Sequence, residues 1–205
     1  SGRTVVVTGA NSGIGKIAAA ELAANGARVI LAVRNTEKGD AAAAEMSGET
    51  EVRQIDLSDQ DSVHAFAEGI DEKIDVLINN AGIMACPLQR TPQGFEWQFG
   101  TNHLGHFTLT NLLLPQITDR VVALSSTAHE IGKIDLDDLN YEVRSYSRWG
   151  AYSQSKLANL MFAYELQRKL EAAGSELRAY ACHPGYASTN LQSHTGSSLQ
   201  SAVMW

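Results

Sequence analysis

The chain has 205 residues, of which 44% are hydrophobic and 19% charged, and its formal net charge is −7. This length allows one domain with a large core, and the negative charge argues against a general nucleic-acid binder. Two cysteines exclude a disulfide scaffold or a multi-cysteine metal site and favour a reducing, cytoplasmic compartment, and no apolar run approaches the ~18 residues of a membrane span.

Short β-branched runs alternate with alanine-rich stretches in the first half of the chain. Residues 4–8 (TVVVT) are apolar enough for a strand that is buried on both faces of a parallel sheet. A glycine turn precedes a helix over residues 14–25, and Gly26 follows it where a left-handed cap is expected. The next expected elements are a strand at 28–33, a helix at 36–46, a strand at 52–55, a helix capped by Ser58 and running to 70, and a strand at 75–79.

The second half continues this alternation. We expect a helix at 102–114, a strand at 120–124, a polar connection at 127–148, a helix at 149–173 and a strand at 177–182. Alternating strands and helices imply right-handed crossovers, and therefore a single α/β domain with a doubly wound parallel sheet between two helical layers. The connection at 127–148 either covers the site described below or forms a solvated surface loop.

The turn after the first strand, TGANSGIG, carries three glycines within seven residues, at Gly9, Gly13 and Gly15. Glycine lets the backbone approach a ligand closely, and the helix that follows offers unpaired N–H groups to an anion. An ordinary strand-to-helix turn would need only one glycine. The turn therefore predicts a phosphate cradle for a dinucleotide.

The residue after the second strand bears on the choice between nicotinamide cofactors. An acidic residue there would accept a hydrogen bond from the ribose 2′-hydroxyl, whereas an arginine suits a 2′-phosphate. This chain has Arg34 at that place and Lys38 one helical turn later. The prediction is a preference for NADPH over NADH; the alternative is that Arg34 is a solvated surface residue.

Tyr152 and Lys156 lie four residues apart, so that both face the same side of the predicted long helix. A nearby ammonium favours the phenolate, which predicts a lowered pKa for Tyr152 and a role in acid–base chemistry. Polar residues follow the fourth and fifth strands at the same sheet edge, Asn79 in the run NNAG and Ser126 in the pair Ser125–Ser126. A pair of serines after a strand is also typical of a turn or helix cap.

Together these motifs resemble the classical short-chain dehydrogenase/reductase family. They are TGANSGIG, NNAG, Asn102, Ser126, the Tyr152–Lys156 pair and a PG-x-x-x-T segment, in family order over nearly the whole chain. The runs TNHLGHF and SSTAHEIGKI are most similar to retinol dehydrogenase-like and protochlorophyllide reductase-like members. The resemblance implies a Rossmann-type fold and an NADP(H)-preferring carbonyl reductase or alcohol dehydrogenase that acts on an apolar substrate.

The resemblance also implies roles for four catalytic residues. Tyr152 would exchange the proton of the substrate oxygen, Lys156 would lower the pKa of Tyr152 and hold the nicotinamide ribose, and Ser126 would bind the substrate oxygen. Asn102 would distort its helix and position a water in a proton relay to Lys156. The residues expected to bind the cofactor are Gly9, Asn11, Ser12, Gly13, Ile14, Gly15, Arg34, Asp56, Leu57, Asn79, Ala81, Gly82, Tyr152, Lys156, Pro184, Gly185 and Thr189.

Other features support narrower expectations. His103 and His106 form an H-x-x-H pair, but no further ligand stands at matching spacing, so we predict packing and no metal site. Family members often dimerise through the helices that carry Asn102 and Tyr152, which implies a homodimer or homotetramer. Relatives usually continue past Thr189, so we expect 1–205 to lack a C-terminal substrate-covering segment and a last strand, and the isolated chain to bind cofactor but turn over poorly.

Two alternative functions remain open at this stage. One is a non-catalytic NADP-binding regulator or scaffold on the same fold, although all four catalytic positions are filled here. The other is a sugar-nucleotide epimerase or dehydratase, whose glycine motif usually has different spacing.

Overall fold

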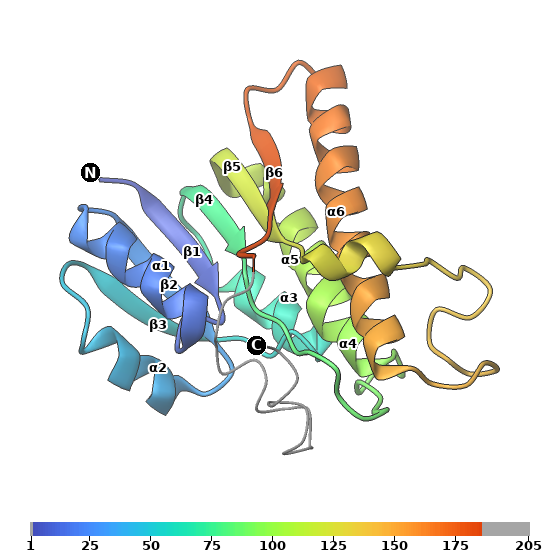
Figure 1. The fold of residues 1–205 in the computed structure, drawn as a ribbon. Coiled ribbons are helices and arrows are strands. Elements are labelled where there is room, and N and C mark those ends of the chain that lie inside the picture. Colours follow the sequence, from blue (N-terminus) through green and yellow to red (C-terminus); the bar gives the residue numbers. More distant parts are fainter. Residues whose placement is uncertain (1, 186–205) are drawn as a thin grey trace.

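A six-stranded parallel sheet forms the centre of the structure, a computed structural model that describes residues 2–185 (Figure 1). The strand order is β3-β2-β1-β4-β5-β6, so the chain starts in the middle of the sheet and winds outward in both directions. The strands are β1 (Thr4–Thr8), β2 (Arg28–Val33), β3 (Thr50–Gln54), β4 (Ile74–Asn79), β5 (Ile117–Leu124) and β6 (Arg178–Cys182).

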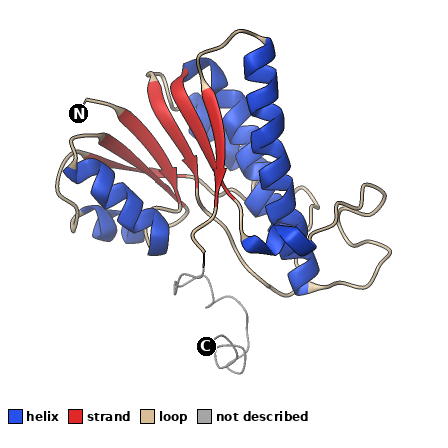
Figure 2. Cartoon of the chain, turned by 45° about the horizontal axis from the view of Figure 1, so that its top comes forward, coloured by secondary structure: helices blue, strands red, loops and turns tan. Residues whose placement is uncertain are grey.

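Helices connect the strands and pack on the two faces of the sheet (Figure 2). They are α1 (Gly13–Ala24), α2 (Thr36–Ala43), α3 (Gln60–Glu68), α4 (Trp97–Phe99), α5 (Gly105–Leu113) and α6 (Arg148–Ala172). Short turns of other helix types are the π-helix η1 (Gly100–Leu104) and the 3₁₀ turns η2 (Leu114–Gln116) and η3 (Thr127–Ile131). None of the described helices is both long and apolar enough to span a membrane.

Two apolar cores lie on opposite faces of the sheet because successive strand side chains point to opposite sides. Val6 packs with Leu109 of α5 and Leu166 of α6, whereas Val5 and Val7 pack on the α1 side. Buried strands of this kind read as continuous apolar runs, as TVVVT does. The predicted doubly wound, three-layer α/β fold is confirmed.

Several predicted boundaries move by a few residues. The cap of α3 is Asp59, whose side chain accepts from the Asp61 N–H, and not Ser58, which was the predicted cap. Ser58 instead donates its hydroxyl to Asp56 at 2.6 Å. The predicted helix at 102–114 is longer and irregular, running through α4, η1 and α5.

The second half of the sheet is less covered on the α1 side than the first. A hollow of about 370 Å³ lies there, between α1 and strands β4 and β5, with an apolar lining that includes Leu22, Val76 and Val122. On the edge strand β6, Tyr180 is 49% exposed.

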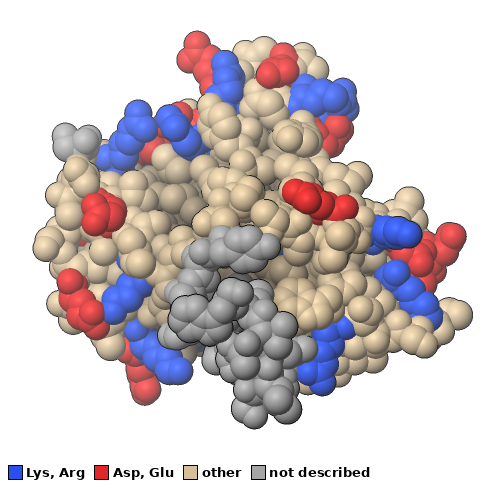
Figure 3. Space-filling model, viewed as in Figure 1, with Lys and Arg blue, Asp and Glu red and all other residues tan. Residues whose placement is uncertain are grey.

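On the face shown in Figure 3, Lys and Arg side chains are interspersed with Asp and Glu around the rim.

Candidate active site

The turn between β1 and α1 brings backbone close to the carboxyl end of the sheet. Gly9 has φ +67°, in the left-handed region that favours glycine. A Cβ on Gly15 would lie 2.3 Å from Asn80 Nδ2 and 2.7 Å from the Gly9 carbonyl oxygen, so this position admits no side chain. Ser12 begins α1 without a side-chain cap, which leaves the first-turn N–H groups suited to an anion.

Thr8 ties this turn to the loop that follows β4. Its buried hydroxyl oxygen accepts from the backbone N–H groups of Asn80 and Ala81, both at 2.9 Å, and Asn80 Nδ2 donates to the Thr8 carbonyl at 2.7 Å. Asn79 is buried beside them and donates to Thr110 at 2.8 Å. Its side-chain oxygen has no hydrogen-bond partner within the described part of the chain, so an acceptor is left for a ligand.

Two residues predicted to bind the cofactor, Arg34 and Asp56, follow β2 and β3, which are neighbours in the sheet. Arg34 is exposed directly after β2, and Asn35 beside it caps α2 by accepting from the Lys38 N–H at 2.8 Å. Asp56 follows β3, where one carboxylate oxygen accepts from both the N–H and the hydroxyl of Ser58. Leu57, also expected to bind the cofactor, has its side chain buried in the core.

The two serines after β5 have different partners. Ser125 is buried and donates to the Lys156 carbonyl at 2.8 Å, which fastens the strand end to α6. Ser126 begins η3 and has a side-chain hydrogen bond to Tyr152. The structure therefore brings Ser126, rather than Ser125, to the tyrosine hydroxyl.

Tyr152 lies under an apolar cover. It is 5% exposed, packs with Met84 and Ala85, and meets the ring of Trp149 edge-on at 6.0 Å between centroids. Burial raises the pKa of Tyr152 above its ordinary value, and the hydrogen bond to Ser126 opposes this only in part. The predicted lowering of the pKa of Tyr152 is therefore wrong for this arrangement, because desolvation of the phenol is the largest effect and Lys156 is not among the groups that shift it.

Lys156 lies one turn further along α6 and is 4% exposed. Its ammonium nitrogen is 5.7 Å from the centroid of the Tyr152 ring and donates to the Leu124 carbonyl at 3.1 Å. Burial lowers the pKa of Lys156 to about 8, while Cys182 on β6 acts in the opposite direction. A virtual Cβ on Gly82 would lie 3.5 Å from Lys156 Nζ, so the loop after β4 passes directly over the lysine.

Asn102 lies in the π-helix η1, where the helix is distorted as the resemblance implied. Its side chain holds both backbone groups of Ile83: Oδ1 accepts from the N–H at 2.8 Å and Nδ2 donates to the carbonyl at 2.9 Å. Nδ2 also donates to Ser155 at 2.9 Å. Asn102 thus joins the loop after β4 to α6.

Two residues that sequence reasoning did not assign to the site, His106 and Asn159, contact the Asn102 carbonyl with their side chains. Asn159 lies seven residues after Tyr152 and three after Lys156, and this helical spacing could have placed it on the same face. His106 and His103 are both engaged in hydrogen bonds with protein groups, to Asn102 and Asn159 respectively.

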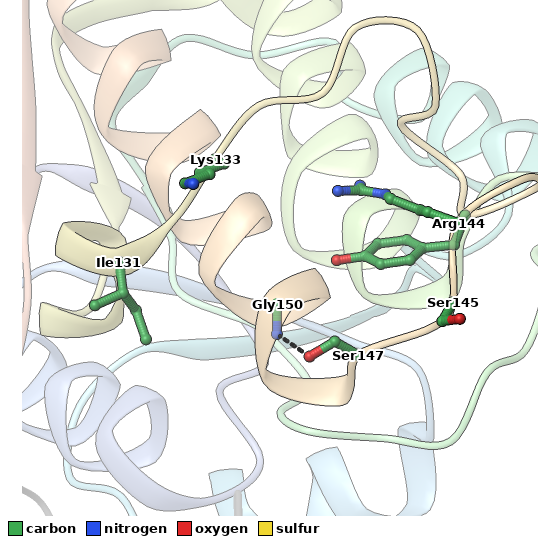
Figure 4. A pocket seen from close by; sticks show the side chains of 7 residues that line it. Ile131, Lys133, Arg144, Ser145, Ser147 and Gly150 are labelled. Carbon is green, nitrogen blue, oxygen red and sulfur yellow. Dashed lines mark hydrogen bonds between the residues drawn. The ribbon is translucent and has the colours of Figure 1, made fainter.

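The connection at 127–148 packs against the start of α6. Tyr146 donates to Glu96, and Gln98 donates to both Tyr146 and the Arg148 carbonyl at 2.9 Å. A separate hollow of about 230 Å³ lies between this connection and the first turn of α6, lined by the residues in Figure 4, where Ser147 caps Gly150. Leu136 and Val143, which are 81% and 92% exposed, mark the outer part of the connection. Within the connection, however, Tyr141 is buried, Asn140 accepts from the Glu96 N–H at 2.9 Å and the Leu139 carbonyl accepts from Gln154 at 3.0 Å, so the connection is anchored at both places.

Comparisons with known proteins agree with this arrangement. The short chain dehydrogenase family matches residues 3–200. The chain belongs to this family. Short-chain dehydrogenases are oxidoreductases that use nicotinamide dinucleotides, and the fold and motif order of this chain are those of the family.

Three similar proteins illustrate the match. Human retinol dehydrogenase 13 is 51% identical over 207 residues, which cover 95% of this chain and 62% of that protein. An uncharacterized protein from Mycobacterium paratuberculosis is 64% identical with a TM-score of 0.89, covering 94% of this chain and 72% of that chain. A short-chain dehydrogenase from Burkholderia phymatum in complex with NAD is 25% identical with a TM-score of 0.75, covering 95% and 69%.

The short-chain dehydrogenase described here therefore spans about three fifths of the curated relative's length, 62% of retinol dehydrogenase 13. Pro184 and Gly185 are exposed after β6, and Gly185 has φ +69°. Thr189, also expected to bind the cofactor, lies outside the described residues.

Proposed function

We propose that the chain is the cofactor-binding and catalytic part of an NADPH-preferring oxidoreductase that acts on the carbonyl or alcohol carbon of an apolar substrate. The observation that carries this proposal is the convergence of Ser126, Tyr152 and Lys156 beside the glycine turn at one edge of the sheet. Ligands of doubly wound sheets bind at this edge.

The residues at this edge fit a nicotinamide dinucleotide. The uncapped start of α1 and the close approach of Gly9 and Gly15 would receive the pyrophosphate, and the unpaired oxygen of Asn79 would accept from a ligand donor. Arg34 is exposed at the end of β2 and suits a 2′-phosphate, which supports the NADPH preference. When bound, the nicotinamide supplies or accepts the hydride.

In the reducing direction, Tyr152 would give its proton to the substrate oxygen while Ser126 donates a hydrogen bond to the same atom. The raised pKa of Tyr152 keeps the phenol protonated at neutral pH, as a proton donor requires. Lys156, buried beside the ring, would restore the proton after each turnover. In the oxidising direction the same groups would act in reverse.

The substrate surface near Tyr152 is apolar. Met84, Ala85 and the half-buried Ala128 pack around the tyrosine, and Trp149 is 38% exposed against its ring. Such a wall favours an apolar carbonyl or alcohol. The similarity to retinol dehydrogenase 13 makes a retinoid-like compound the first substrate to test.

We also infer a homodimer or homotetramer that pairs α5 and α6. Their outer faces expose Phe107, Leu112, Met161 and Tyr164, of which Tyr164 is 68% exposed. An apolar patch of this kind is typical of an interface. A cytoplasmic location remains a prediction that rests on the two unpaired cysteines.

The whole protein would add a C-terminal segment that covers the substrate and completes the sheet. The apolar hollow beside β4 and β5 and the exposed Tyr180 on β6 support this, because parallel sheets are ordinarily covered on both faces. The activity assay therefore uses both this chain and its longer form.

The test is turnover of NADPH with all-trans-retinal, decanal and a sugar nucleotide. Tyr152→Phe should lower kcat by at least about 100-fold, because the proton donor is lost, while NADPH binding by fluorescence titration stays within about twofold. NADPH binding without turnover of any compound would favour a non-catalytic regulator, and turnover of the sugar nucleotide alone would favour an epimerase or dehydratase. Unchanged turnover by Tyr152→Phe would remove this residue as the acid–base group.

A further inference from the structure

A chain of buried hydrogen bonds runs from α6 to the end of β5 behind Lys156. Asn159 is 4% exposed, and its Nδ2 donates to the Asn102 carbonyl at 3.1 Å and to the Leu124 carbonyl at 3.0 Å. The Leu124 carbonyl is the same oxygen that accepts from Lys156 Nζ at 3.1 Å. Asn159 and Lys156 therefore share one acceptor.

The orientation of the Asn159 amide follows from its partners. Both groups near Nδ2 are carbonyl oxygens, which only accept, so the amide nitrogen must face them. On the other side, Oδ1 lies 3.1 Å from His103 Nδ1, which can donate to it. All of the polar atoms of this side chain are thus engaged.

His106 donates to the Asn102 carbonyl from the other direction, with its Nδ1 at 3.0 Å from that oxygen. Burial lowers the pKa of His106 to about 4, so the ring is neutral and Nε2 is an acceptor. Nε2 lies 2.9 Å from the Thr8 hydroxyl, which therefore donates to it. The network thus reaches from Lys156 to the glycine turn.

The Asn102 carbonyl consequently has both of its acceptor positions filled by side chains, one by Asn159 and one by His106. The Asn159 amide nitrogen donates both to this carbonyl and to the Leu124 carbonyl that Lys156 contacts, and so connects the two.

We propose that Asn159 is a positioning residue that holds Lys156 through their shared Leu124 carbonyl. This inference rests on the proposed function only for its kinetic consequences, because the hydrogen bonds themselves do not depend on turnover. An apolar residue at this position would remove one donor from each of two carbonyls, so that the Leu124 carbonyl would keep only Lys156 and the Asn102 carbonyl only His106 of the side-chain donors described here. The titratable groups that face Lys156 are Tyr152 on its own helix, Cys182 on β6 and His106 on α5.

Two substitutions separate the roles of the amide. Asn159→Ala leaves a small polar space between two carbonyls, which can hold a water. That water would solvate the ammonium, so we expect the pH midpoint of Lys156 to rise by about 0.5 or more. Asn159→Leu fills the space with apolar atoms and should lower kcat further than Asn159→Ala does.

The kinetic experiment measures kcat, KM and the pH profile with NADPH and all-trans-retinal. We expect Asn159→Ala to lower kcat about 5- to 50-fold with KM within about twofold, and to move the upper limb of the profile to higher pH. Asn25→Ala is the matched control: Asn25 is an exposed asparagine at the C-terminal end of α1 whose side chain donates to the Glu21 carbonyl of the same helix, and its substitution should leave kcat, KM and the pH profile unchanged. A profile and kcat within twofold of the unsubstituted chain for both Asn159 variants would overturn the proposal.

A second measurement does not require turnover. The ammonium signal of Lys156 is followed against pH by NMR of ¹⁵N-lysine-labelled protein and assigned by its loss in Lys156→Met. If the pH midpoint of Lys156 is higher in Asn159→Ala than in the unsubstituted chain, the proposal is supported even if the chain proves inactive. An unchanged midpoint contradicts the proposal even if the chain is active. If Asn159→Ala does not fold, as judged by circular dichroism, Asn159→Ser replaces it with the same expected shift.

Discussion

The glycine turn and the Lys156 region lie at the same edge of the sheet but are built in different ways. The turn is formed by eight consecutive residues, 8–15, and its expected ligand groups are the backbone N–H groups at the start of α1, which no Ser12 side chain caps. The Lys156 region assembles side chains and carbonyls from η1, α5, β5 and α6, and its side chains Asn102, His106, Lys156 and Asn159 are all buried. The glycine turn depends on the absence of side chains, whereas the Lys156 region depends on a hydrogen-bond partner for each polar side chain.

This difference predicts different responses to substitution. A change in the turn should affect cofactor binding first, because no proton-transfer group lies in it. A change in the Lys156 region should affect kcat, the pH profile and stability together, because each of its groups holds another.

The largest effect is expected at Lys156. Lys156→Met should lower kcat by about 1000-fold, since it removes the ammonium beside Tyr152. The same change should stabilise the fold by about 1–3 kcal/mol at pH 7, because a buried charge is replaced by an apolar side chain of similar length. Kinetics and urea unfolding measure the two effects.

The stability gain should depend on pH with a defined sign. The pKa of Lys156 is about 8 in the folded chain, below its ordinary value of 10.5, so the unfolded chain binds more protons between these two values. The unsubstituted chain therefore gains stability relative to Lys156→Met as the pH rises from 8 to 10.5. A stability difference that stays constant between pH 7 and pH 10 would show that the ammonium is not destabilising.

Local sequence predicted the turn better than the Lys156 region. Strands at 4–8 and 28–33 were predicted to the residue, because continuous β-branched runs between glycine and polar residues leave little choice. Tyr152, Lys156 and Ser126 were placed on the right elements, since parallel strands bring their carboxyl ends to one edge.

The missed features depend on contacts between distant residues. The pKa of Tyr152 is shifted upward because Met84, Ala85 and Trp149 pack over the ring, and no spacing of residues within α6 reveals this packing. The partnership of Asn159 with Asn102 joins residues 57 positions apart. Short-range patterns could identify these side chains as polar but not name their partners.

The next largest effect is expected in the turn, at Gly15. Gly15→Ala places a Cβ 2.7 Å from the Gly9 carbonyl and 2.3 Å from Asn80 Nδ2, so the turn must shift. We expect NADPH to bind about 10- to 100-fold more weakly, because the displaced backbone no longer matches the pyrophosphate. Gly69→Ala, where a Cβ meets nothing closer than 3.4 Å, is the control and should bind NADPH normally. Isothermal titration measures both, and equal affinities would mean that the turn is not the phosphate site.

The smallest effect is expected at Arg34. It tests whether this end of the sheet binds the 2′-phosphate of the cofactor as well as the pyrophosphate. Arg34 is exposed, and its contact with a 2′-phosphate would be screened by solvent, so Arg34→Ala should weaken NADPH binding by about 10-fold and leave NADH binding within about twofold. Raising the ionic strength should narrow the NADPH preference of the unsubstituted chain for the same reason. Arg178→Ala, at an exposed arginine that begins the edge strand β6, should leave both affinities unchanged. If Arg34→Ala weakens the binding of NADPH and NADH equally, this arginine supports the fold of the β2–α2 turn. If neither affinity changes, Arg34 is a solvated surface residue. The cofactor preference would then have to come from Lys38 or from groups outside 2–185.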